Sequence, residues 1–273
     1  MATERIVSVD VRPSFIAVAV LEPRRQQNHV LRVGAVHRTT QRPEEIIAAI
    51  REFNRDEKGS VLAQYAAAAL SPAQCTTDQL VVPPKLPAAD FARAIAYKAK
   101  HMPKPSSPKR VVRSWNLGKH RFAVSPADAG ATAAIQRDYA NAYGLTALSV
   151  HHPGIAWLST FDDLDAIYDD AGPVPYIAFI NAQGFVELQT QPEHLAPDNA
   201  GAAFRATISG IEQSHTSIQR VAFFGNINTP RYQKLNAAAT DRGVELYPFE
   251  TNGKICPPWA FALATAAQGV AWA

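Results

Sequence analysis

The sequence has few cysteines and no long apolar run, and both absences exclude classes of protein. Only Cys75 and Cys256 occur among its 273 residues, with no CxxC motif, which excludes a disulfide-rich scaffold. We expect two half-buried free thiols in a reducing compartment. No stretch approaches the roughly 20 apolar residues that span a bilayer. The N-terminus leads into a strand-like run without a signal-peptide layout, so we expect a cytoplasmic protein.

Excess charge is also small, which limits the kinds of partner that the composition indicates. The 27 basic and 24 acidic residues give a formal charge of +3. That balance predicts solubility, whereas nucleic-acid binding usually shows a basic patch or stripe. Hydrophobic residues make up 47% and charged residues 19% of the chain, which is a globular composition and excludes wholesale disorder.

Apolar patterning predicts an α/β protein that contains two hairpins. The β-branched run over 6–21 is broken at Arg12-Pro13-Ser14, which predicts a hairpin with Asp10 near its bend. A second hairpin is expected over 175–190, and residues 60–69 fit either a strand or a helix. Hairpins that open two α/β halves indicate a duplicated unit. The other expected strands are 30–37, 111–115, 120–124, 145–150, 220–224 and 244–249, and the expected helices are 44–54, 88–100, 127–143, 155–168, 202–214, 230–242 and 259–272.

Two proline-rich breaks, at 81–87 and 102–108, indicate an inserted subdomain. We place it at 86–144, between a first subdomain of 1–85 plus 145–174 and a second of 175–273. Its predicted helix carries Phe91 and Ile95, and its predicted strands are apolar. A small unit packed on a larger α/β body creates a groove, and such grooves commonly bind ligands and peptides. The alternative is that these residues only pack the insert's own core.

Five segments, in sequence order, carry a resemblance to a known family. They are Ser8 to Val18; Leu80 to Pro87 with Phe91, Ile95 and Lys98; His101-Met102-Pro103; Tyr143-Gly144-Leu145 with Val150; and Phe224 to Asn228 with Tyr247-Pro248-Phe249. Together they resemble the type IV pilus assembly protein PilM family of the actin-like ATPase superfold, which is related to the cytoplasmic part of type II secretion platform proteins.

The resemblance implies a fold and a role. The fold would be an actin-like (ribonuclease H-like) duplicated α/β domain with a small inserted α+β subdomain and a reduced second half. The role would be a cytoplasmic scaffold of a pilus or secretion inner-membrane platform. Its implied partner is the cytoplasmic N-terminal tail of an inner-membrane platform protein, bound at Leu86, Phe91 and Ile95. The protein would then reach the membrane through that partner.

The nucleotide segments depart from the family pattern. The resemblance places any nucleotide site at Asp10, Arg12, Ser14, Asn181, Gly225 and Asn226. Arg12 and Pro13 stand where the family has glycine and a hydroxyl residue, and proline removes a backbone donor. The second predicted hairpin has Asn181 at its strand end and no acid until Glu187, although a Mg²⁺ site needs hard oxygen ligands. Residues 191–219 hold about one helix, too little for a nucleotide-clamping subdomain.

These departures favour a degenerate actin-like protein with no catalytic residues, cofactor or metal over an active ATPase. In that interpretation Arg12 is an exposed turn residue and Asp10 caps the hairpin. The alternative is an ATP-binding nucleotide switch in the same machine, with ATP and Mg²⁺ held by Asp10 and a phosphate held by the charge of Arg12. A third alternative is an α/β binding module that shares only the fold.

Three clusters of charged or potentially metal-ligating residues are interpreted without a catalytic or metal-binding role. His151 and His152 are adjacent on a predicted strand and point to opposite faces, so we expect no shared metal ion. The acidic run at Asp162, Asp163, Asp165, Asp169 and Asp170 is interpreted as a solvated helix face. The basic stretch from Lys98 to Arg113 suits an exposed insert near an acidic partner or an anionic membrane, and we expect no nucleic acid.

Overall fold

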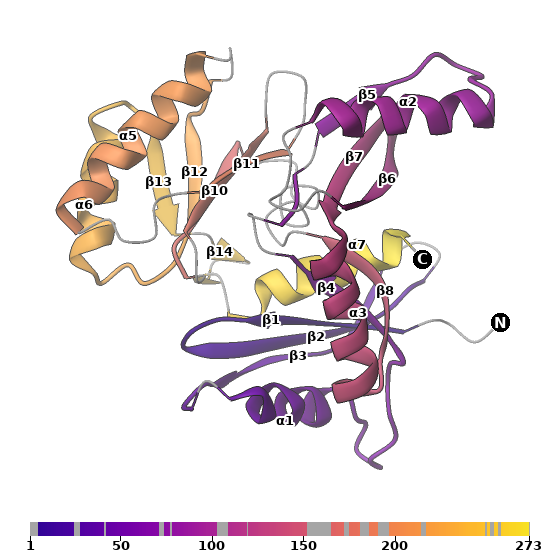
Figure 1. Cartoon of the computed structure of the whole chain (residues 1–273). Coiled ribbons are helices and arrows are strands. Elements are labelled where there is room, and N and C mark those ends of the chain that lie inside the picture. Colours follow the sequence, from indigo (N-terminus) through magenta and orange to yellow (C-terminus); the bar gives the residue numbers. More distant parts are fainter. Residues whose placement is uncertain are drawn as a thin grey trace.

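The computed structural model describes most of the chain. The described residues are 5–24, 28–40, 42–70, 74–76, 78–102, 109–118, 120–151, 165–171, 175–180, 186–190, 197–213, 217–248, 250–251, 254–255 and 258–272. Two five-stranded sheets form its centre, and a three-stranded sheet forms the insert (Figure 1).

The first sheet has the order β3-β2-β1-β4-β8. Strands β1 to β3 form an antiparallel meander, whereas β4 and β8 run parallel to β1. Both faces of the meander are apolar, so helices must cover both of them. The bounds of this sheet are Ile6–Val11 (β1), Phe15–Glu22 (β2), His29–His37 (β3), Tyr65–Ala69 (β4) and Thr146–His151 (β8).

Different helices cover the two faces of the first sheet. Helices α1 (Pro43–Phe53) and α3 (Ala129–Tyr143) cover the face that carries Val18 and Val20. Helix α7 (Ala260–Trp272) covers the other face, where alanines at 17 and 19 meet alanines at 262 and 266. These small side chains let the helix approach the strands closely, and Phe261 of α7 also packs against the second sheet. Helix α7 therefore joins the two sheets.

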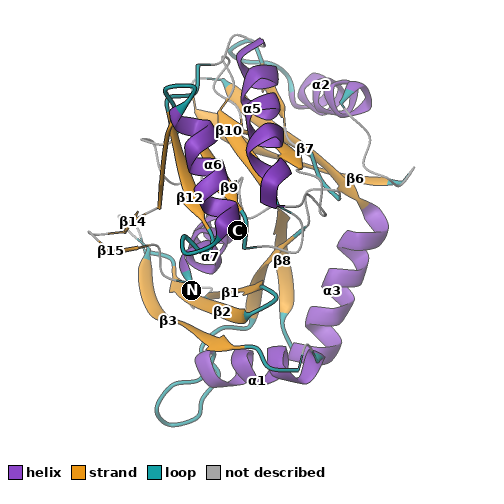
Figure 2. Ribbon diagram, turned by 90° about the vertical axis from the view of Figure 1, so that its left-hand side faces the viewer, coloured by secondary structure: helices purple, strands orange, loops and turns teal. Residues whose placement is uncertain are grey.

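The second sheet repeats the topology of the first, with the order β11-β10-β9-β12-β13. Strand β9 lies antiparallel to β10 and parallel to β12, as β1 does to β2 and β4. Helices α5 (Pro197–Gln213) and α6 (Pro230–Thr240) cover one face of this sheet (Figure 2). The bounds of its strands are Ala166–Asp169 (β9), Tyr176–Ile180 (β10), Val186–Thr190 (β11), Arg220–Phe224 (β12) and Glu245–Pro248 (β13); two short strands, Glu250–Thr251 (β14) and Lys254–Ile255 (β15), pair nearby.

The insert consists of helix α2 (Ala88–His101) on a sheet of order β5-β7-β6. Ile95, Ala99 and Met102 pack against Val124 of that sheet. Its strands are Asp78–Val81 (β5), Arg110–Gly118 (β6) and Arg121–Asp128 (β7). Strand β5 lies before the predicted boundary at 85 but pairs with the insert strands, and β9 lies before the predicted boundary at 174 but pairs in the second sheet. The predicted boundaries therefore do not follow the sheets, and the division into subdomains stays a prediction.

Most predicted elements are confirmed in the described residues, and one is wrong at its C-terminal end. The helix expected over 155–168 does not extend through residues 166–168, which form the buried strand β9. Residues 155–164 of that expected helix lie outside the described residues. A short apolar run buried on both faces does not reveal its period, so pattern alone does not separate strand from helix there. The ambiguous stretch 60–69 contains strand β4. Gly144 ends α3 with φ +65°, as its position after the helix predicts.

Two glycines of helix α5 are expected to respond in opposite ways to alanine. A Cβ on Gly201 would lie 2.9 Å from the carbonyl oxygen of Lys234 in α6, whereas a Cβ on Gly210 would meet nothing within 4 Å. Gly201→Ala should lower the free energy of unfolding by about 1–3 kcal/mol. Gly210→Ala should raise it by about 0.5–1 kcal/mol. Urea denaturation of both variants checks this, and equal effects would contradict the close packing of α5 on α6.

Candidate functional site

Two acidic strand ends face each other between the sheets. Asp10 lies near the end of β1, and Asp169 is the last residue of β9. Because β1 and β9 occupy the same position in sheets of the same order, the two aspartates are equivalent positions of the duplicated unit. This corrects two sequence interpretations. The acid that the second hairpin was expected to lack is Asp169, one strand earlier than expected. Asp169 is also buried at the end of a strand, rather than exposed on a solvated helix face.

Arg12 joins these two carboxylates. Its Nε donates to Asp10 Oδ2 at 2.7 Å, and its Nη1 donates to both carboxylate oxygens of Asp169, at 2.8 and 2.7 Å. The guanidinium carbon lies 5.3 Å from the ring centre of Phe224 and 4.8 Å from that of Phe261. The expectation of an exposed turn residue is therefore wrong, since Arg12 is 3% exposed. A planar guanidinium with several donors is suited to such a buried position.

The electrostatics keep Arg12 charged. Burial disfavours its cation, but Asp10 and Asp169 outweigh that cost and raise the pKa of Arg12. Burial raises the pKa of Asp10, although the neighbouring Arg12 partly offsets this effect. The ionised cluster has two negative charges and one positive charge. This excess of negative charge disfavours a phosphate group beside the cluster, and the Arg12 cation already lies between the two acids.

The turns after β1 and β9 use their backbone donors inside the protein. The N–H of Arg12 donates to the carbonyl of Phe15 at 2.8 Å, and Pro13 has no N–H. After β9, the N–H of Asp170 donates to the carbonyl of Phe224 at 2.8 Å, and that of Ala171 donates to Asp169 Oδ1 at 3.0 Å. These four positions offer no free backbone donor with which to cradle a phosphate.

A cavity of about 480 Å³ is lined by Pro13 and Asp170, which follow the cluster residues Arg12 and Asp169 in sequence. Three predicted residues, Ser14, Gly225 and Asn226, line it together, whereas Asp10 and Arg12 lie outside its lining. Phe15, Phe223, Phe224 and three prolines make much of the wall apolar. A Cβ on Gly225 would lie 2.8 Å from the Phe223 ring, so this glycine serves close packing. The predicted Asn181 lies outside the described residues.

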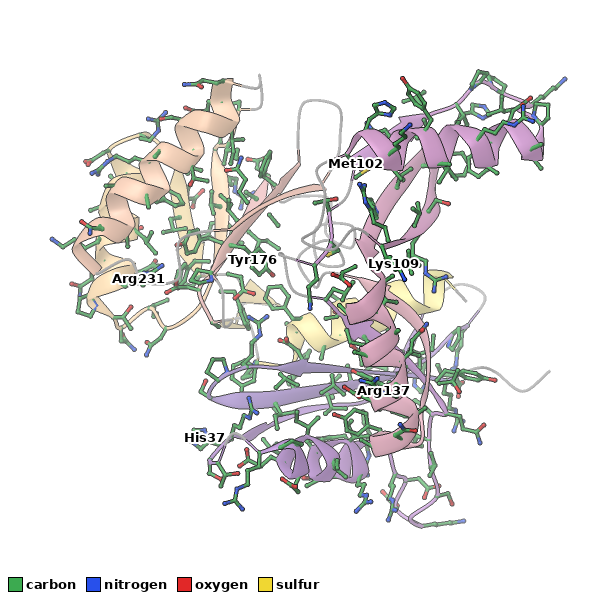
Figure 3. All side chains as sticks on the ribbon, in the orientation of Figure 1. His37, Met102, Lys109, Arg137, Tyr176 and Arg231 are labelled. Carbon is green, nitrogen blue, oxygen red and sulfur yellow. The ribbon has the colours of Figure 1, made fainter. Side chains whose placement is uncertain are left out.

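The structure adds residues that sequence reasoning missed. Asp170, at the cavity wall, receives a 2.7 Å hydrogen bond from Arg231 Nε. Arg231 also contacts the Tyr168 hydroxyl at 3.3 Å. Figure 3 labels Arg231, at the start of α6, and Tyr176, on β10. One signal was available: the apolar run before Asp169-Asp170 ends in an acid, as the run before Asp10 does.

A second cavity, of about 310 Å³, lies on the insert and includes Leu86 and Phe91. The ring of Phe91 packs 4.5 Å, centre to centre, from that of Phe122. Ile95, the third predicted partner residue, faces the insert core instead. Lys85 and His120 also line this cavity, with φ of 66° and 61°. They are the only non-glycine residues with positive φ in the described part of the chain, and such strain often collects at functional sites.

Among the described residues, no group of three or more metal-ligating side chains is found, and no helix is long and apolar enough to cross a membrane. His151 is described but His152 is not, so the expectation for this pair stays a prediction. No protein-family model matches the chain, and no curated protein matches it either.

Solved structures do match over nearly the whole chain. The "PilM-PilN type IV pilus biogenesis complex" has a TM-score of 0.65 at 14% identity, covering 97% of this chain and 98% of that one. A Bacteroides thetaiotaomicron protein described as having an actin-like ATPase fold has a TM-score of 0.53 at 9% identity, covering 100% and 97%. The chain has the actin-like ATPase fold. The cytoplasmic domain of EpsL, an inner-membrane component of the Vibrio cholerae type II secretion system, has a TM-score of 0.49 at 12% identity, covering 97% and 94%.

ATP with Mg²⁺ is the group that an actin-like ATPase fold implies, and the described residues of this site do not fit it. The two acids that would face a metal ion are already joined by the Arg12 cation. The backbone N–H groups of Arg12, Asp170 and Ala171 are used internally, and the cavity wall is largely apolar. The charges and donors of this site therefore suit an internal ion pair better than a nucleotide-bound metal ion.

Proposed function

We propose that this protein is a cytoplasmic scaffold of a type IV pilus or type II secretion-like inner-membrane platform. It would bind the cytoplasmic N-terminal tail of a membrane partner without hydrolysing ATP. The observation that carries this proposal is the Arg12 cation between Asp10 and Asp169. A cation held between these two acids supports a role in binding rather than in metal-dependent hydrolysis, because Mg²⁺ is held by carboxylate oxygens. The fold match to PilM in complex with PilN supports a platform role.

The cavity on the insert supports a site for the partner's tail. Phe91 and Phe122 provide an apolar floor, and Leu86 is half-buried beside them. Lys85 lies exposed at the rim. An extended tail would place an apolar side chain against the rings and a carbonyl or carboxylate near Lys85. Grooves of this kind take a few anchor side chains that dominate the binding energy.

Phe91→Ala is expected to weaken binding of the tail by about thirtyfold or more, which is typical of an aromatic anchor. The measurement is calorimetric titration with peptides covering the cytoplasmic tails of candidate inner-membrane partners. Tyr97→Ala is the matched control, because Tyr97 lies on the same helix and is 68% exposed. Circular dichroism checks that the insert stays folded, and Leu86→Ala is the second variant if Phe91→Ala disturbs it. Unchanged affinity in folded Phe91→Ala would refute this site.

A nucleotide switch in the same machine is the second candidate. The observation that favours it is the cavity that brings Ser14, Gly225 and Asn226 together between the sheets. In that function Mg-ATP would have to displace Arg12 from Asp10 and Asp169. Titration with Mg-ATP separates the two candidates directly.

A further inference from the structure

Basic charge is concentrated in the insert. The insert, from the start of β5 at Asp78 to the end of β7 at Asp128, contains ten of the chain's 27 basic residues and three of its 24 acidic residues. The insert therefore has a formal charge of +7, whereas the rest of the chain has −4. A molecule with charge separated in this way turns its basic end toward a negatively charged surface.

Helix α2 has two faces of different character. Phe91, Ile95 and Ala99 recur at helical spacing and pack inward, toward β5 to β7. On the opposite side of the helix, a second set of residues recurs at spacings of three and four positions. We call this side the outer face of α2. This face is formed by Ala89, Arg93, Ala96, Tyr97 and Lys100, all of which are exposed.

The outer face of α2 combines cations with an apolar surface. The Arg93 side chain is 83% exposed, and Tyr97 is 68% exposed. Asp90 Oδ1 lies 3.6 Å from Arg93 and offsets part of its charge. Alanines fill the positions between the larger side chains, so the face has no acidic residue of its own. Lys and Arg side chains are attracted to anionic headgroups, and tyrosine is enriched at the level of the headgroups.

We propose that the outer face of α2 binds an anionic bilayer surface directly. This inference extends the proposed function, in which the membrane is reached through a partner, and it rests on that function for the identity of the membrane. The tail cavity at Leu86 and Phe91 lies on the same insert, so a tail that emerges from the membrane would hold this insert beside the bilayer. Juxtamembrane cations are attracted to anionic headgroups, and this attraction falls off within a Debye length.

The test is vesicle flotation of the full chain without any partner. Vesicles of phosphatidylcholine with about one third phosphatidylglycerol should bind the protein, and pure phosphatidylcholine vesicles should not. Because each surface cation contributes about fivefold, Arg93→Gln with Lys100→Gln should weaken binding about 25-fold. The matched control is Arg51→Gln with Lys58→Gln, which removes the same charge from exposed positions outside the insert. Tyr97→Ser should weaken binding further, and added salt should release the protein.

Several results would overturn the proposal. One is equal binding to neutral vesicles, and another is an equal loss in the Arg51/Lys58 control. A third has two parts: the protein does not bind the vesicles, and the Arg93/Lys100 variant loses affinity for duplex DNA or for a second copy of the chain. Anisotropy measures the affinity for DNA, and ultracentrifugation measures self-association. Because the vesicles contain no protein partner, failure here leaves the tail-peptide titration unaffected. Failure of that titration likewise leaves the lipid result intact.

Discussion

Arg12→Met is expected to lower the free energy of unfolding by about 5 kcal/mol, the upper end of the range for breaking a buried ion pair. The change leaves two buried carboxylates, Asp10 and Asp169, without a cation between them. Since domains are stable by only about 5–15 kcal/mol, the variant should approach unfolding at room temperature. Urea denaturation followed by circular dichroism measures this loss.

The pH dependence of the stability lost in Arg12→Met provides a control for this prediction. Burial already raises the pKa of Asp10 in the folded protein, and removal of Arg12 raises it further. A folded state that binds more protons than the unfolded state loses stability as pH rises through the raised pKa. The deficit of Arg12→Met should therefore be largest at neutral pH and shrink toward about pH 4, the ordinary range of aspartate.

A triple variant separates charge from shape. Asp10→Asn with Arg12→Met and Asp169→Asn removes all three charges while it keeps similar volumes. It should recover most of the lost stability, because an apolar or neutral replacement of a buried charge cluster is often tolerated. A loss of less than about 1 kcal/mol in Arg12→Met alone, the size of a surface pair, would show that the guanidinium is not buried between the acids.

The second large effect is expected at Asp169, in contrast to its neighbour. Asp169→Asn should cost about 3 kcal/mol, because Asp169 is fully buried and accepts two hydrogen bonds from Arg12. Asp170→Asn should cost about 1 kcal/mol, because its pairing with Arg231 is partly exposed. The two variants differ by one position in sequence, so they form a matched pair. Equal losses, or a larger loss at Asp170, would contradict this assignment.

Local pattern predicted much of the fold. The break at Arg12-Pro13-Ser14 lies where β1 turns into β2, and β12 coincides with the predicted strand 220–224. Helix α5 begins at Pro197, earlier than the predicted start at 202. Strand β9 was not predicted, because its four residues are buried on both faces and show no amphipathic period.

The candidate site was less predictable, because its central contact is long-range. Arg12 and Asp169 are 157 positions apart, and one sequence contains no local signal that pairs them. Arg12 at a proline-containing turn is typical of an exposed residue, and only the packing of the two sheets buries it. Ser14, Gly225 and Asn226 were named from the family resemblance, and the structure brings them to one cavity because each follows the end of a strand. Phe91 and Ile95 share a helical face, which is why the sequence grouped them, but of the two only Phe91 lines the cavity.

Calorimetric titration with ATP and Mg²⁺ tests the central claim most directly, namely that the cleft holds its own cation in place of a nucleotide-bound metal. We expect no heat of binding and no change in melting temperature, for the wild type at any practical ligand concentration. A ligand present at 100 times its Kd would add about 2.7 kcal/mol of stability, which a thermal shift reveals readily. Micromolar binding of Mg-ATP, with a matching rise in melting temperature, would contradict the account and make the nucleotide switch the leading function.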